Sequence, residues 1–201
     1  MFSFDQKIDE LIRRLGAPEG TTNARQGDQV FNVHYPPHLW AELRTRLPKL
    51  MARLKDQSYA PRHCSLLALM EKIFGDNGKK IALLRRSEAR QQSHQAFTDT
   101  LHSILANKKP GESLDLESPI VAAIEEEIQA AASKPNGLLL ITDIEMAHPL
   151  LRVSAFEQVL QGRFAVPTVF FYPGERGNIG DNPSYLGVYP SDGNYRSTHI
   201  Y

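Results

Sequence analysis

The fold is decided by residues 137–174, which read GLLLITDIEMAHPLLRVSAFEQVLQGRFAVPTVFFYPG. Two apolar runs, Leu138 to Thr142 and Val166 to Tyr172, are short and rich in strand formers, so each predicts a strand buried on both faces. Between them, residues 153–162 place apolar side chains at helical spacing and end at Gly162, a typical helix cap. A helix that joins two buried strands forms a crossover unit, which predicts a mainly parallel sheet.

The preceding sequence extends this pattern. Residues 4–15 predict an amphipathic N-terminal helix, and the alternation from Val30 to Tyr35 predicts the first core strand. Pro36 and Pro37 stop that strand and start a helix that runs to about Lys55, and Pro48 should kink it or split it in two. The other expected elements are a strand near 62–65, a helix ending near 75, helical sequence over 79–106 with a polar interruption at 90–94, a helix from 119 to 134, and an edge strand within 195–201.

Length and composition favour one soluble domain. The chain has 201 residues and no linker-like break, so we expect a single α/β domain over residues 1–201, with a glycine- and proline-rich tail at 175–201. Equal numbers of basic and acidic residues, 23 each, supply no general attraction to nucleic acid or to a membrane. One cysteine, Cys64, fits a reducing cytoplasm, and the first residues resemble neither a signal peptide nor a membrane span. We therefore expect a cytoplasmic protein.

The order of the predicted elements resembles the core of P-loop nucleotide hydrolases, but the phosphate-binding loop is missing. Such a loop needs converging backbone amides and a lysine that contacts the phosphates. Here Tyr35 is followed by Pro36 and Pro37, which have no amide hydrogens, and no lysine follows closely. We therefore expect no nucleotide hydrolysis and no bound cofactor.

Two acids nevertheless keep an enzymatic alternative open. Asp143 and Glu145 follow a buried strand at its carboxyl end, where α/β sheets usually place functional groups. Carboxylates suit a divalent cation, so the alternative function is a small nucleotide- or metal-dependent enzyme, nuclease-like or NTPase-like. Without a third ligand or a catalytic lysine, the simpler interpretation is a solvated strand terminus and a helix-capping acid.

The remaining candidate groups favour structural or interaction roles. Cys64 lies in an apolar run and should be a buried, inert thiol, and most of the seven histidines should lie on the surface or at edges. Basic pairs at 79–80, 85–86 and 108–109 are typical of solvated helix faces, so direct DNA binding is the less favoured alternative. Tyrosines of the tail can anchor an interface, or can simply pack the tail onto the sheet edge.

Four segments together resemble a known family: FDQKIDELIRRL, HPLLRVSAFEQVL, VPTVFFYPG and the closing NYRSTHIY. They are similar to BrxB, a small component of the bacterial BREX phage-exclusion systems. The likeness is most specific over residues 137–201 and weakest over 79–118. It implies a non-catalytic partner within a defence locus that also encodes a PglZ-type phosphatase-like protein, a large ATPase, a DNA methyltransferase and a DNA-binding protein.

The resemblance also implies which residues matter, although residues 143–148 depart from the family pattern of glycines and an aromatic. A cation at position 152, a helix start, is unfavourable unless Asp143 or Glu145 pairs with it. We expect binding to other BREX proteins, first the PglZ-type protein and then the large ATPase, through the loops at 143–149 and 172–195, with Tyr185 and Tyr189 as anchors. Positions that match the family pattern are Pro149, Leu151, Arg152, Tyr172, Pro173, Gly174, Tyr195 and Arg196.

Overall fold

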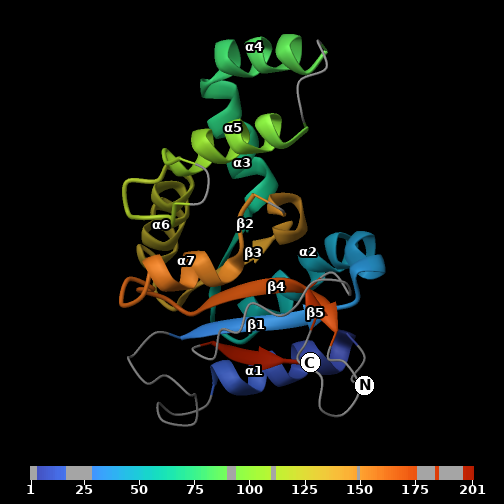
Figure 1. The fold of residues 1–201 in the computed structure, drawn as a ribbon. Coiled ribbons are helices and arrows are strands. Elements are labelled where there is room, and N and C mark those ends of the chain that lie inside the picture. The colour runs from blue at the N-terminus through green and yellow to red at the C-terminus, as the bar shows by residue number, and fades with distance from the viewer. Residues whose placement is uncertain are drawn as a thin grey trace.

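The computed structural model describes residues 4–16, 29–89, 94–109, 112–148, 150–175, 184–185 and 197–201, and these form a sheet between two layers of helices (Figure 1). The helices are α1 (Phe4–Leu15), α2 (Trp40–Asp56), α3 (Leu66–Asp76), α4 (Gly78–Glu88), α5 (His94–Ala106), α6 (Pro119–Ala132) and α7 (Val153–Val159), with 3-10 turns η1 (Pro37–Leu39) and η2 (Ile144–Ala147). The strands are β1 (Val30–Tyr35), β2 (Ala60–Ser65), β3 (Gly137–Thr142), β4 (Thr168–Glu175), β5 (Ser184–Tyr185) and β6 (Thr198–Ile200).

The sheet is parallel along its main path, in the order β2-β3-β4-β1-β6. β3 and β4 are neighbours joined through α7, as the crossover pattern predicts. The short β5 pairs antiparallel with the end of β4, and β6 forms one edge. The predicted α/β class and mainly parallel sheet are therefore confirmed.

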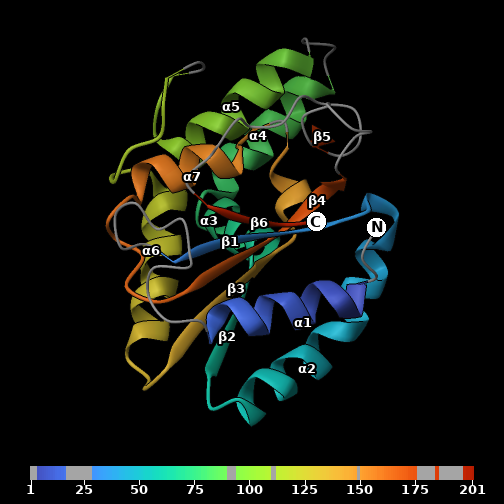
Figure 2. The ribbon, with the colours of Figure 1, turned by 90° about the horizontal axis from the view of Figure 1, so that it is seen from below.

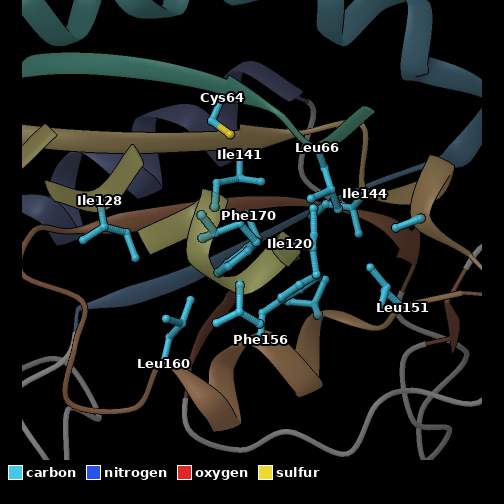
Figure 3. Close-up of a cluster of buried hydrophobic side chains, with 14 of the residues drawn as sticks. Cys64, Leu66, Ile120, Ile128, Ile141, Ile144, Leu151, Phe156, Leu160 and Phe170 are labelled. Atoms are coloured by element: carbon cyan, nitrogen blue, oxygen red, sulfur yellow. The ribbon is translucent and has the colours of Figure 1, made fainter. Parts of the chain in front are cut away.

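Alternating side chains supply the two faces of the sheet. In β1, Phe31, Val33 and Tyr35 pack with α1 and α2, whereas Val30 belongs to the opposite cluster beneath α3, α6 and α7. Figure 2 shows α1 and α2 side by side along one face of the sheet. In the opposite cluster, shown in Figure 3, Ile141 and Phe170 point from the sheet toward the helices. Both faces are covered, so the central strands are apolar throughout.

Both ends of β4 differ from the predictions. β4 begins at Thr168 rather than Val166 because Pro167 has no amide hydrogen, and the Thr168 amide is the one that donates to Gln29 O, at 2.9 Å. β4 also continues past Tyr172, since β5 pairs with its last residues. Of the two outcomes predicted for Pro48, the split is wrong, because α2 is continuous from Trp40 to Asp56, whereas the kink stays a prediction. Pro48 is exposed, and a buried stripe on α2 packs against the sheet: Leu43, Leu47, Leu50 and Leu54.

Other predicted elements agree more closely. α1 has the predicted bounds, and β2 begins two residues before the predicted strand. The helical region after residue 78 forms α4 and α5, and residues 90–93, where an interruption was predicted, lie outside the described residues. Within the described ranges, no helix is both long and apolar enough to cross a membrane.

Candidate functional site

Asp143 follows β3 directly and is buried at the carboxyl edge of the sheet. Its φ of 60° lies in the left-handed region, which aspartate tolerates better than most residues, and this turns the chain into η2. Its carboxylate accepts hydrogen bonds from Trp40 Nε1 at 3.1 Å, from Thr142 Oγ1 at 3.2 Å, and from Ser65 Oγ. The donors lie on α2, β3 and β2, so one carboxylate connects three elements.

Glu145 lies half-buried on η2, beside Asp143. Tyr35 donates its hydroxyl to Glu145 Oε2 at 3.0 Å, while Oε1 is buried and accepts no hydrogen bond from the described residues. Burial raises the pKa of Glu145, and the nearby Asp143 adds to that rise. Burial also lowers the pKa of His63, whose Nε2 lies 2.8 Å from Thr142 Oγ1.

The interpretation of these acids as a solvated terminus and a cap is wrong. Asp143 is only 2% exposed, and no side chain caps η2. Asp143 is instead an internal acceptor for neighbouring elements. In the part of the chain that the structure describes, no group of three His, Cys, Asp or Glu side chains could hold a metal ion.

Cys64 behaves as the sequence predicts. The side chain is buried within the cluster of Figure 3, and burial raises the pKa of its thiol to about 12. Such a thiol is almost entirely protonated near neutral pH, so it is a poor nucleophile. Its role is packing.

A second polar cluster, at the β1–β6 edge, was not predicted from the sequence. Asn32 Nδ2 donates to Glu157 Oε1 of α7 at 2.9 Å and to Ser197 Oγ at 2.7 Å. Ser197 Oγ lies 3.3 Å from His199 Nε2, and His199 Nδ1 lies 2.8 Å from His34 Nε2. These five side chains form one continuous hydrogen-bonded chain that joins α7, β1 and the edge strand β6.

His34 is the most buried member of this chain, so it departs from the prediction that most histidines lie at the surface or at edges. Its ring stacks on Tyr201 at 4.3 Å and lies 4.8 Å from the ring of Tyr172. Burial lowers its pKa to about 3, with His199 and Lys7 adding to the shift. The alternation within β1 was the available signal: a strand covered on both faces must bury any polar side chain that it carries.

The other predicted site residues fall into separate environments. Leu151 is buried and Arg152 is exposed, and both line a groove of about 610 Å³ between α7 and residues 112–116, which we call the Arg152 groove. Tyr172, Pro173 and Gly174 are buried at the end of β4, which makes them structural parts of the strand. Tyr185 forms β5, whereas Pro149, Tyr189, Tyr195 and Arg196 lie outside the described residues.

The ion pair expected for Arg152 stays a prediction. Arg152 is exposed at the start of α7, whereas Asp143 is buried and receives its hydrogen bonds from Trp40, Ser65 and Thr142.

Comparison with known proteins identifies the family. The sequence-family model of the BREX protein BrxB matches residues 63–200, which is more than half of the chain. The chain belongs to the BrxB family. Membership confirms the resemblance inferred from the sequence and makes the chain a component of a BREX antiphage system. The BrxB match begins within β2 and runs to the end of the edge strand β6. It thus includes Asp143 and the Arg152 groove, but not α1, β1 and α2. No curated protein and no solved structure matches the chain.

Proposed function

We propose that this BrxB-family chain is a non-catalytic interaction component that binds another protein of its BREX system. One observation carries the non-catalytic part: the carboxylate of Asp143 already accepts hydrogen bonds from Trp40, Ser65 and Thr142. A divalent cation at this carboxylate would compete with those donors for the same oxygens. The acid at the strand end therefore serves the fold.

The segment after β1 gives independent support. Pro36 and Pro37 have no amide hydrogens. The amide of Leu39 donates to Pro36 O at 2.9 Å, and the amide of Trp40 donates to Pro37 O. Among residues 36–40, His38 is therefore the one residue whose amide hydrogen is neither missing nor bonded within the turn. A phosphate cradle needs several free amides that converge on one point, so a single amide is too few.

For the contact surface we propose the groove beside α7. Leu116 is 43% exposed at one rim, and Leu150 and Arg152 line the opposite side. Leu116 is exposed and Leu150 is partly buried, and such apolar side chains beside an arginine are typical of interface anchors. The connection that leads to the groove also exposes Met146, at 40%. From the family resemblance we propose the PglZ-type protein as the partner and the large ATPase as the second candidate.

Co-purification of the tagged chain from cells that express the whole locus tests this proposal. We expect a BREX protein to accompany the wild-type chain, and its recovery to fall about tenfold or more in Arg152→Glu and Leu116→Asp variants. Lys49→Glu is the matched control, because Lys49 is exposed on α2, across the sheet from the groove. In the same assay, the double variant Tyr185→Ala, Tyr189→Ala tests whether these tyrosines of the tail anchor the interface, in which case recovery of the partner falls, or only pack the tail onto the sheet edge, in which case a folded variant keeps full recovery.

Two results would contradict the proposal. If no BREX protein accompanies the wild-type chain, it is not an interaction component of this kind. If the Arg152 and Leu116 variants retain full recovery and full phage restriction, the groove is not the contact surface.

The enzymatic alternative keeps one favourable observation. Glu145 has a raised pKa and a buried Oε1 that accepts no hydrogen bond from the described residues, and it lies next to a second carboxylate. Such pairs occur in acid–base sites. A Glu145→Gln variant that is folded and binds its partner, yet loses phage restriction, would favour this alternative.

A further inference from the structure

Helix α4 presents an exposed face on which three cations surround one leucine. Lys79, Leu83 and Arg86 are spaced i, i+4 and i+7, so they form one stripe, and Lys80 lies beside it. All four residues are exposed, and Leu83, at 63%, exceeds the exposed fractions of Leu116 and Met146. In Figure 1, α4 lies at the end of the molecule opposite α1.

This face is not used to hold α4 in place. Ile81 packs against the core from the other side of the helix, and Arg85 lies on the same side as Ile81. None of the acids in the described ranges forms an ion pair with Lys79, Lys80 or Arg86, whereas arginines of α1 and α2 pair with Glu10 and Glu42. The charges and the leucine are thus available to a partner.

The position of the leucine distinguishes between the possible partners. Three cations would suit either a nucleic-acid backbone or an acidic protein surface. A phosphate backbone offers no apolar contact to Leu83, and α4 carries no aromatic side chain on which a base could stack. A leucine at the centre of a cationic helix face suits an apolar pocket with an acidic rim, which is the helix-in-groove mode of protein recognition.

We infer that α4 docks its Lys79, Leu83 and Arg86 face into a groove of a partner protein that has an apolar floor and an acidic rim. The inference rests on the proposed function in one respect, because the partner is another protein of the same BREX system. The docking face is separate from the residues that line the Arg152 groove. One chain could therefore contact two surfaces at once.

Photocrosslinking in cells that express the whole locus tests the inference. A photoreactive amino acid at Ala82, an exposed neighbour of the stripe, leaves all four residues of the face intact. We expect a covalent adduct with a protein encoded by the locus, attached at a peptide rich in Asp and Glu. The same photoreactive amino acid at Gln129, exposed on α6, is the positional control and should give no such adduct.

Charge and shape are tested separately. Reversing Lys79, Lys80 and Arg86 to glutamate should reduce the adduct about tenfold or more, and Leu83→Ala should reduce it about tenfold. Each single reversal, Lys79→Glu or Arg86→Glu, should reduce the adduct in part, and Arg85→Glu is the control for these, since it reverses one charge on the same helix but off the face and should preserve most of the adduct. These residues are exposed, so far-UV circular dichroism and melting should match the wild type.

Several outcomes would overturn the inference. They are an adduct that nuclease removes, an adduct with a second copy of this chain, and an adduct that survives the triple charge reversal. Absence of any adduct overturns it as well. If no adduct forms but the wild-type chain still co-purifies with a BREX protein, the α4 face is not a docking surface and the proposed function stands. If no adduct forms and no BREX protein co-purifies, the proposed function is wrong as well.

Discussion

Asp143 and His34 are polar side chains in the interior, and each is accommodated by a different means. Burying a carboxylate is costly unless hydrogen bonds replace its water, and Asp143 has donors from three elements. His34 instead stays neutral, because burial lowers its pKa to about 3. Both side chains tie segments that are far apart along the chain, so we expect their replacement to affect folding before it affects any surface.

Asp143→Ala should lower the free energy of unfolding by about 3 kcal/mol, because it leaves buried donors without an acceptor and places alanine at a positive φ. Urea denaturation followed by far-UV circular dichroism measures the change. Asp143→Asn is the control, since asparagine tolerates this backbone and keeps one acceptor oxygen, and it should lose only about 1 kcal/mol. An alanine variant with the wild-type urea midpoint would show that the hydrogen bonds do not stabilise the fold.

Acid should destabilise the protein through His34. Its pKa is about 3 when folded and 6.5 ordinarily, so between these values the unfolded chain binds a proton that the folded chain does not. Stability is fully present above the unfolded pKa and falls as the pH drops below it, with a slope approaching about 1.4 kcal/mol per pH unit.

Urea midpoints measured from about pH 7 down to pH 5 test this slope. His34→Gln should remove most of it, whereas His38→Gln, at an exposed position on η1, should keep it. Equal slopes in wild type and the His34 variant would mean that another group carries the acid sensitivity.

At the scale of elements, the turn between α6 and β3 positions β3 beside β2. Asn136 has a φ of 52°, its side chain donates to Ser58 O at 3.1 Å, and its carbonyl accepts from the Ala60 amide at 2.8 Å. The turn therefore aligns the starts of β2 and β3. Gly137 follows at once and lies against Ala131 in the last turn of α6, and its amide donates to the O atom of Lys134, just after that helix, at 3.1 Å.

Gly137→Ala should lower the free energy of unfolding by about 3 kcal/mol or more. An added Cβ would lie 2.1 Å from Ala131 O, a backbone atom that cannot rotate away, so the helix or the strand must shift. Gly75→Ala is the matched control, because nothing lies within 4 Å of an added Cβ there. Gly75 lies in the last turn of α3, where the gain in helix propensity is smaller than in a helix interior, so Gly75→Ala should raise stability by at most about 0.5 kcal/mol. Denaturation curves for both variants measure the difference, and similar midpoints would contradict this account of the turn.

At the scale of the whole molecule, the sheet positions two candidate surfaces. The Arg152 groove lies beside α7, and the basic face of α4 lies at the end of the molecule opposite α1 (Figure 1). Both surfaces lie on the face of the sheet that α3, α5, α6 and α7 cover. The other face of the sheet is covered by α1 and α2, whose buried side chains pack on the strands.

The isolated protein should not bind ATP with magnesium in the micromolar range, because the turn after β1 lacks the amides of a phosphate cradle. Isothermal titration calorimetry measures this directly. Micromolar binding that disappears in an Asp143→Ala variant of unchanged fold would contradict the prediction, and it would move the enzymatic alternative ahead of the interaction role.

The sequence by itself determined the class of fold and most of its elements. Apolar periodicity is a local property, so it predicted α1, β1 and β3 within a residue, and the crossover through α7 predicted parallel neighbours. Chain order and motifs also predicted the family that the comparison confirmed. The same local patterns predicted the wrong start for β4, because the role of Pro167 depends on which strand lies beside it.

The tertiary structure alone decided which polar residues are inside and what they contact. Trp40 lies 103 residues from Asp143 along the chain, and Ser65 lies 78 residues from it, yet all three meet at the carboxyl edge. Asn32 meets Ser197 across a separation of 165 residues only because β1 and β6 are neighbours. Strand order follows from how the whole set of helices covers the sheet, and no local pattern carries that information.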